Sequence, residues 1–458
     1  MPSDQPADHI DLDAPIVMVS ADTHIGPRLK EDLRAYCPQK YLEEYDSFVK
    51  AYEPFMKPSV VRKMFVPEDM DLGEMAGADD TFTPSNNTAG HYDIHTRLKD
   101  MDRDGVAGEV VYHGSQNAQC FPLLNTAGGT FNALVFSPIG SPHELELAAV
   151  GQHMYNHWLA DQCSVAPERF AGLAHVPMWD IEAAIKEVEW ASDAGLKGVN
   201  FPAPKLGIAP YDEPEWERFW AVCAERNMAL STHAGSDIDS VTNARPHTLL
   251  VMDMYDPQEK ILPRMMFGGV FERHPNLKFV ITELQKPPSR WWSQAVDYYD
   301  ELWEANIDAL RKQVPKPPRE YFRNNVFHGN SLLFLDPQQV EIAVERGYAS
   351  NILWGSDYPH AEGPYRLPAN DTEETRTVKA LRNGVAGAPA EVVKQIAGET
   401  AVKVYGMDGD KLAAVARRIN AITLRWAMTP LDVVPPDWKE LARMTLPFPE
   451  YHRAMAAV

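Results

Sequence analysis

Carboxylate and imidazole side chains come together in residues 351–364, Asn-Ile-Leu-Trp-Gly-Ser-Asp-Tyr-Pro-His-Ala-Glu-Gly-Pro. The apolar run at 352–354 predicts a short buried strand, and the glycine and proline that follow predict where it ends. Asp357 and His360 then stand at the carboxyl end of that strand. Such a pair can bind a metal ion or move a proton. In the alternative interpretation, Asp357 caps a turn and His360 is an ordinary loop residue.

A second acidic residue and histidine follow the strand predicted at residues 16–20. Asp22 and His24 are separated by one residue, and in an extended chain two such residues point the same way. Their side chains can therefore direct a carboxylate oxygen and an imidazole nitrogen at a single ion. Taken alone, this short motif also fits a purely structural role.

Polar side chains also end the other predicted strands, which we place at residues 106–113, 170–175, 197–201, 229–233, 277–283 and 325–328. The residues at these carboxyl ends are His113, His175, Asn200, His233, Glu283 and His328. Catalytic groups of parallel α/β barrels come from this end of the strands, so the set predicts an active site. For His113, His175 and His328, a place in the core or in a cap is the alternative.

Helical patterns separate these strands, at residues 144–162, 181–193, 215–226, 258–273, 288–312 and 337–346. Eight strands alternating with helices predict a (β/α)8 TIM barrel over residues 16–407. Residues 28–95 predict an N-terminal insertion that acts as a lid or an interaction surface, because a polar stretch without a clear period follows a few helical pieces.

Both ends of the chain are expected to lie outside the barrel. Residues 1–15 are polar and predict a flexible arm. Residues 408–458 predict a helical C-terminal extension, with a helix at 413–426 and a proline-rich stretch at 430–449. The extension is too short for a core of its own, so we expect it to pack on the barrel or at an oligomer interface. The partner subunit would be a second copy or a related chain.

The chain has 458 residues, of which 45% are hydrophobic, and a formal net charge of −22. Its size predicts a large core, and its negative charge argues against nucleic acid or an anionic membrane as a partner. Apolar runs stay below the roughly 18 residues that a membrane span needs. We therefore expect a cytoplasmic enzyme with a small-molecule substrate. Its scattered cysteines, Cys37, Cys120, Cys163 and Cys223, are expected to be free thiols.

The motifs and their order resemble the amidohydrolase-related family of the amidohydrolase superfamily, over about residues 16–407. They are Asp22-Thr-His24, Met101-Asp-x-Asp-Gly-Val106, Gly195-Leu-Lys-Gly-Val199, Ser231-Thr-His233-Ala-Gly and Gly355-Ser-Asp357-Tyr-Pro-His360. The resemblance implies a metal-dependent barrel that hydrolyses C–N or C–O bonds or decarboxylates aromatic acids. It also implies that Asp22, His24, His233 and Asp357 are the metal ligands.

Two positions depart from the family's pattern. Asp22 stands where the first strand usually has a histidine, and Glu283 stands where the sixth strand often has one. Two histidines with three carboxylates form an oxygen-rich set, which manganese and iron accept more readily than zinc does. We expect one or two divalent ions (Mn, Fe or Zn), with Glu283 as a bridging ligand or as a base. Asn200 replaces the lysine that a bridging carbamate would need.

Four functions remain open. The leading hypothesis is hydrolysis of a small organic substrate by a metal-activated water, with Asp357 taking a proton and His360 or His175 stabilising the developing charge. The second is a dinuclear Fe/Mn oxygenase that hydroxylates a small amine or similar compound, which Asp22 and Glu283 favour. The third is a metal-dependent decarboxylase. The fourth is a non-catalytic partner subunit, against which the intact set of ligands argues.

Overall fold

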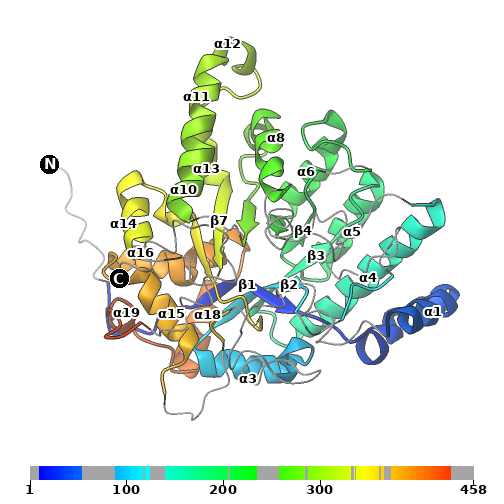
Figure 1. The fold of residues 1–458 in the computed structure, drawn as a ribbon, viewed down its shortest axis with the longest axis horizontal. Coiled ribbons are helices and arrows are strands. Elements are labelled where there is room, and N and C mark those ends of the chain that lie inside the picture. Colours follow the sequence, from blue (N-terminus) through cyan, green and yellow to red (C-terminus); the bar gives the residue numbers. More distant parts are fainter. Residues whose placement is uncertain are drawn as a thin grey trace, which may run out of the picture.

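The computed structural model describes residues 10–53, 88–115, 117, 119–123, 140–204, 207–234, 257–283, 287–331, 335, 337–360, 363–365 and 373–434. Eight parallel strands form its central sheet and are hydrogen-bonded in chain order. They are β1 Val19–Ile25, β2 Gly108–His113, β3 Phe170–His175, β4 Gly198–Asn200, β5 Ala229–His233, β6 Phe279–Thr282, β7 Val326–Ser331 and β8 Ile352–Gly355. Figure 1 shows helices around these strands, so the predicted (β/α)8 barrel is confirmed.

The barrel closes between β1 and the residues just beyond β8. The amide of Asp357 donates to the carbonyl oxygen of Asp22 at 2.9 Å, and the amide of His24 donates to that of Tyr358 at 2.6 Å. Gly355 lies so close to β1 that an added β-carbon would stand 2.7 Å from Cβ of Asp22. A side chain at this position would force apart the two segments that carry Asp22 and Asp357, so a glycine is required.

Helices cover the outside of the sheet and connect its strands. They include α3 Ile94–Asp104, α4 Pro142–Ser164, α5 Ile181–Asp193, α6 Glu217–Glu225, α8 Ile261–Phe267, α9 Val270–Arg273, α10 Pro288–Trp292, α11 Tyr298–Ala305, α12 Ile307–Leu310, α13 Pro318–Asn325, α14 Pro337–Arg346 and α15 Arg376–Val385. Ser141 and Glu144 start α4 as a capping box, in which each side chain accepts from the other residue's amide. Among the helices of the described ranges, none is both long and apolar enough to span a bilayer.

Two strands differ from their predicted bounds in a way that affects the site. β1 occupies residues 19–25 rather than 16–20, so Asp22 and His24 lie inside the strand and not after it. The apolar pattern stops early because polar functional residues occupy a strand that is buried along its whole length. β7 extends to Ser331, so His328 is its third residue and does not stand at its carboxyl end.

Two predicted helices are also divided in the structure. The helix expected at 288–312 ends at Ala305 and resumes as α12, and the following helix α13 had not been predicted. The helix expected at 413–426 is two helices, α18 Gly409–Arg418 and α19 Leu424–Ala427. Asn420 separates them with a φ of 53°, a left-handed conformation that ends a helix although the apolar periodicity continues.

The predicted insertion is described only in part. Residues 28–53 include α1 Leu42–Tyr52, and Leu29 and Tyr45 are fully buried in the main hydrophobic core. Residues 54–87 lie outside the described residues, so a role as a lid stays a prediction.

The described part of the N-terminal arm contacts the C-terminal extension. The amide of Leu424 donates to the carbonyl of Ala14 at 3.0 Å, and the guanidinium of Arg425 pairs with the carboxylate of Asp13 at 2.8 Å. Residues 1–9 and 435–458 of the two ends lie outside the described residues.

A second hydrophobic cluster lies where the C-terminal helices meet the strands. Leu412 and Val415 of α18 pack in one cluster with Val19 of β1, Leu173 of β3 and Leu353 of β8. Since burial of such side chains contributes roughly 1.5–3 kcal/mol each, the described part of the extension stabilises the barrel directly.

Candidate metal centre

β1 carries two of the predicted ligands. The strand pairing shifts between Ser20 and Thr23, so Asp22 sits at an irregularity rather than in the regular alternation. The Oδ1 atom of Asp22 lies 3.4 Å from Nε2 of His24, and their side chains are at most 2% exposed. Both therefore face the same buried point.

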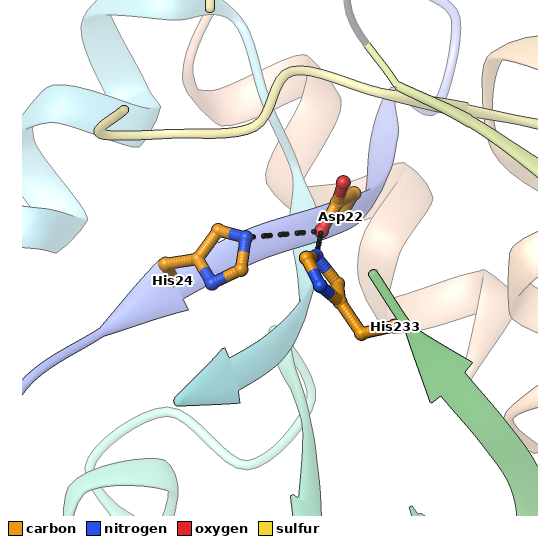
Figure 2. Close-up of side chains that lie close together, drawn as sticks. All are labelled: Asp22, His24 and His233. Atoms are coloured by element: carbon orange, nitrogen blue, oxygen red, sulfur yellow. Dashed lines mark ion pairs between the residues drawn. The ribbon is translucent and has the colours of Figure 1, made fainter. Parts of the chain in front are cut away.

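β5 brings in the third predicted ligand, because His233 is its last residue. The Nε2 atom of His233 lies 3.3 Å from the same Oδ1 of Asp22. Figure 2 shows the two imidazoles approaching this carboxylate from different strands. The planes of the two rings are at 89° to each other. Ligand atoms of Asp22, His24 and His233 lie within 4.8 Å of one another.

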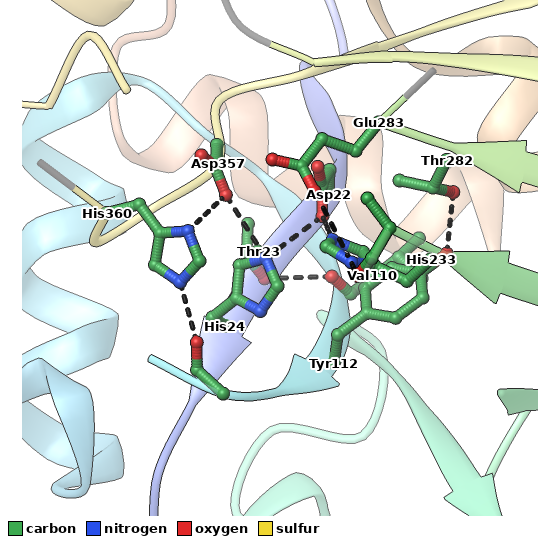
Figure 3. A network of polar contacts seen from close by, with 12 residues as sticks. Asp22, Thr23, His24, Val110, Tyr112, His233, Thr282, Glu283, Asp357 and His360 are labelled. Carbon is green, nitrogen blue, oxygen red and sulfur yellow. Dashed lines mark hydrogen bonds and ion pairs between the residues drawn. The ribbon is translucent and has the colours of Figure 1, made fainter. Parts of the chain in front are cut away.

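Asp357 completes the cluster from the segment after β8. Its Oδ1 atom lies 3.1 Å from Nε2 of His24 and 3.0 Å from Nδ1 of His360 (Figure 3). The rings of His24 and His360 stack with centroids 3.9 Å apart. Asp357 has a φ of 52°, a strained conformation for a residue with a side chain, and strain of this kind is typical of functional positions.

Main-chain carbonyls fix how the three histidines present their nitrogens. Nδ1 of His24 donates to the carbonyl of His113 at 3.0 Å. Nδ1 of His233 donates to the carbonyl of Ala234 at 2.9 Å, and Nε2 of His360 donates to that of Gly114 at 2.6 Å. A carbonyl only accepts, so each of these nitrogens carries a proton. In a neutral imidazole the opposite nitrogen then has a lone pair, and it faces the carboxylate of Asp22 or Asp357.

The charges in the cluster depend strongly on one another. Burial opposes ionisation of Asp22, but His233 and His24 lower its pKa well below the usual range. Burial also disfavours the His24 cation, yet Asp22 and Asp357 raise its pKa well above its ordinary value. The pKa of Asp357 is lowered by His360 and His24 against the effect of burial. The carboxylates are thus held ionised and require positive charge between them.

A divalent cation fits this requirement. The Nε2 atom of His24 and both carboxylate oxygens of Asp357 are buried without a hydrogen-bond partner, although they face each other. An imidazole lone pair directed at a carboxylate is repulsive unless a proton or a metal ion lies between them. Nitrogen and oxygen donors in this number suit Zn²⁺, Mn²⁺ or Fe²⁺. The assignment of Asp22, His24, His233 and Asp357 as ligands stays a prediction.

Glu283 lies beside this cluster, directly after β6. Its Oε2 atom is 3.5 Å from Nδ1 of His233, the nitrogen that points away from Asp22. The residue has a φ of 57° and is 7% exposed. Its carboxylate therefore contacts a candidate ligand, and its predicted role in bridging two ions remains untested.

The other predicted strand-end residues surround the cluster without joining it. His175 ends β3 next to Phe121, with ring centroids 4.8 Å apart, and the metal-binding groups found among the described residues include neither His175 nor His113. Burial lowers the pKa of His175 to about 4 and that of His113 well below its ordinary value, each with help from neighbouring histidines. Both are therefore neutral at pH 7. His328 lies deeper, against Trp291 at 5.3 Å.

Sequence reasoning missed two residues that hold the site. Arg97 of α3, fully buried, donates to the carbonyl of His24 and to the carboxylate of Glu109, both at 2.6 Å. The ring of Tyr112 lies 4.9 Å from that of His233, and its hydroxyl pairs with Thr282 at 2.8 Å. Glu109 was the available signal, because an acidic residue inside a fully buried strand requires a cationic partner.

The fold and this site define a (β/α)8-barrel protein with a buried cluster of potential metal ligands. The family model described as amidohydrolase matches residues 141–407. The chain therefore belongs to the amidohydrolase family, and the expected resemblance is confirmed.

Its similar sequences include several decarboxylases. The chain is 24% identical over 282 residues to γ-resorcylate decarboxylase of Rhizobium sp., covering 58% of this chain and 76% of that one. It is 25% identical over 327 residues to 2-amino-3-carboxymuconate-6-semialdehyde decarboxylase of Dictyostelium discoideum, covering 70% and 78%. These relatives are decarboxylases rather than hydrolases.

Solved structures share the fold. The 5-carboxyvanillate decarboxylase of Sphingomonas paucimobilis superimposes with a TM-score of 0.53 at 18% identity, over 86% of this chain and all of that one. The manganese-bound 5-carboxyvanillate decarboxylase of Novosphingobium aromaticivorans gives 0.54 at 16% identity, over 85% and 97%. At these identities the likeness supports the barrel fold alone.

Proposed function

We propose that this protein is a metal-dependent, non-oxidative decarboxylase of a small aromatic carboxylic acid. One observation carries the proposal: a buried cluster of three histidines and two carboxylates includes the Asp357–His360 pair, which can hold a proton. The chain's similarity to γ-resorcylate decarboxylase favours this reaction over hydrolysis, the leading hypothesis from the sequence.

Asp22, His24, His233 and Asp357 would hold the ion. Manganese is the cation named with the Novosphingobium structure, and the oxygen-rich set present here accepts it. When bound, a divalent cation would supply positive charge that offsets the substrate carboxylate and a neighbouring oxygen. These residues themselves exclude water from this charge, since all four side chains are at most 10% exposed.

Decarboxylation replaces CO₂ with a proton at the same carbon, so the enzyme must deliver one proton per turnover. His360 donates through Nε2 to Gly114, which leaves Nδ1 as the atom facing Asp357 at 3.0 Å. A proton held on Nδ1 of His360 can pass through the ionised carboxylate of Asp357 to the substrate carbon. The electrons of the C–C bond stay with the ring carbon, which keeps the new proton, and CO₂ departs, so neither an oxidant nor a reductant is needed.

Neutral polar groups suit the remainder of an aromatic substrate. The Nε2 atoms of His113 and His175 are buried without a hydrogen-bond partner, and both rings lie against Phe121. In our proposal they bind uncharged oxygen substituents such as phenolic hydroxyls. A second negative charge on the substrate would not be offset here, because both rings are neutral.

The oxygenase remains a second candidate because Glu283 adds a third carboxylate within 3.5 Å of His233. It requires two ions and O₂, whereas the decarboxylase requires one ion and no O₂.

Matched substrates separate decarboxylation from hydrolysis. The manganese-loaded protein is incubated with hydroxybenzoic acids and with their methyl esters and amides. We expect the free acids to release CO₂ and the esters and amides to be inert. Methanol or ammonia release, with the acids left intact, would overturn the proposal in favour of hydrolysis.

A further inference from the structure

Two histidines on the outer surface of the barrel face each other with their nitrogens in close contact. His153 and His157 lie one turn apart on α4, and their Nε2 atoms are 3.0 Å apart. The side chain of His153 is 43% exposed, so solutes in the solvent can reach the pair. Neither residue belongs to the metal-binding groups found at the barrel centre.

A carboxylate on the neighbouring helix orients His153. Glu187 of α5 accepts from Nδ1 of His153 with both oxygens, at 3.0 and 2.9 Å. A carboxylate accepts only, so Nδ1 carries the proton and Nε2 of the neutral ring presents a lone pair toward His157. A carboxylate that accepts from the second nitrogen of a histidine is the usual outer partner of a metal-binding imidazole.

The carboxylate and the second ring are held in place in turn. Asn156, fully buried, donates to Glu187 at 2.7 Å. Trp190 stacks on His157 with ring centroids 4.1 Å apart and meets His153 edge-on at 5.0 Å. Burial and the nearby His153 lower the pKa of His157, which favours its neutral form. The arrangement is therefore organised before any ligand arrives.

We propose that His153 and His157 form a second metal site, which binds a nitrogen-preferring divalent transition cation. Two metal–nitrogen bonds of about 2.0–2.1 Å across the 3.0 Å gap would enclose an angle of about 95°. That angle suits neighbouring positions of a tetragonal Ni²⁺ or Cu²⁺ ion better than the wider angle of tetrahedral zinc. Water would complete the coordination. The proposal does not depend on the reaction in the barrel.

The alternative is a plain hydrogen bond, in which Nε2 of His157 donates to Nε2 of His153. Equilibrium dialysis of the manganese-loaded, full-length protein against micromolar Ni²⁺ distinguishes the two. Because nickel can also displace manganese in the barrel, the informative quantity is the difference between the parent protein and its variants. His153→Asn and His157→Asn each remove one nitrogen. His143→Asn is the matched control, since His143 lies on the same helix with a 57% exposed side chain.

We expect the parent protein and His143→Asn to bind one nickel ion per chain more than either site variant. Nickel should also raise the melting temperature more in those two proteins, because an ion bound only by the folded state stabilises it. Equal nickel content in all four proteins would overturn the proposed metal site and support the plain hydrogen bond between His153 and His157. A circular dichroism spectrum of each variant that matches the parent's shows that a variant that binds less nickel is still folded.

Discussion

The Nδ1 atom of His360 lies 3.0 Å from Oδ1 of Asp357, and its Nε2 atom donates to the carbonyl of Gly114 at 2.6 Å. The carbonyl fixes the ring so that Nδ1 faces the carboxylate. Asp357 is fully buried and also faces His24 at 3.1 Å. One carboxylate thus lies between a candidate metal ligand and a histidine that can share a proton with it.

Replacing His360 should separate proton delivery from metal binding. His360→Asn removes the proton partner of Asp357 and leaves the four candidate ligands in place. We expect kcat to fall roughly 10²- to 10⁴-fold, the usual contribution of a positioned acid or base, with metal content unchanged. Asp357→Asn should lower both kcat and metal content. Elemental analysis beside steady-state kinetics measures this, and an unaltered kcat in His360→Asn would refute the proton role.

Glu283→Gln tests the number of ions. In our account Glu283 is a second, longer contact of Nδ1 of His233 beside the carbonyl of Ala234, so the metal content at saturating manganese should stay at one ion per chain. The affinity of the site for the ion should fall roughly 10- to 100-fold, which is typical when a group that contacts a metal ligand from outside is lost. Asp22→Asn serves as the control that does lose metal. A drop from two ions to one in Glu283→Gln would instead support the dinuclear oxygenase.

Asp104 should make stability depend on pH. Burial raises the pKa of Asp104 to about 7, although Thr377 donates to its carboxylate. The ordinary pKa of this side chain is 3.8, so between these two pH values the folded protein keeps a proton that the unfolded chain has lost. The protein therefore loses stability as pH rises from about 4 to 7, by roughly 3–4 kcal/mol.

Asp104→Asn should abolish this loss, because an amide does not ionise. Urea unfolding at pH 5 and pH 8 measures it, and the variant should gain stability relative to the parent at pH 8. Asp308→Asn, at an exposed position, is the control. The same pH dependence in the parent and in Asp104→Asn would contradict the prediction.

Deleting residues 409–458 should expose the hydrophobic cluster that joins α18 to the strands. Leu412 and Val415 belong to this cluster together with strand residues such as Val19 and Leu353. We expect a lower melting temperature and aggregation or altered assembly, measured by calorimetry and light scattering. Leu412→Ala provides a milder test, with a cost of about 2–5 kcal/mol for a buried leucine. A soluble, fully active deletion variant with an unchanged melting temperature would show that the extension is dispensable.

The apolar strands were visible in the sequence because parallel barrel strands are buried on both faces. The run at 352–354 therefore gave β8, and with it Asp357. β1 was placed too early because Asp22, Thr23 and His24 are polar although they are at most 2% exposed. A strand made largely of functional polar residues does not show the pattern by which strands are recognised.

Contacts to main-chain atoms could not be predicted. The carbonyls of His113, Gly114 and Ala234 decide which nitrogen each histidine presents, and a carbonyl belongs to every residue type alike. His360 and Gly114 are also 246 positions apart in the chain. The sequence thus indicated candidate side chains that the fold brings together, and only the fold shows how they are oriented.

Turnover in D₂O without O₂ distinguishes decarboxylation from oxygen-dependent hydroxylation. The manganese-loaded protein is incubated under nitrogen with a hydroxybenzoic acid, and CO₂ and the mass of the aromatic product are measured. Our account predicts one CO₂ per product molecule and one deuterium at the carbon that carried the carboxylate, since the proton of the Asp357–His360 pair exchanges with solvent. Turnover only in air, giving a hydroxylated product that retains its carboxylate, would contradict it.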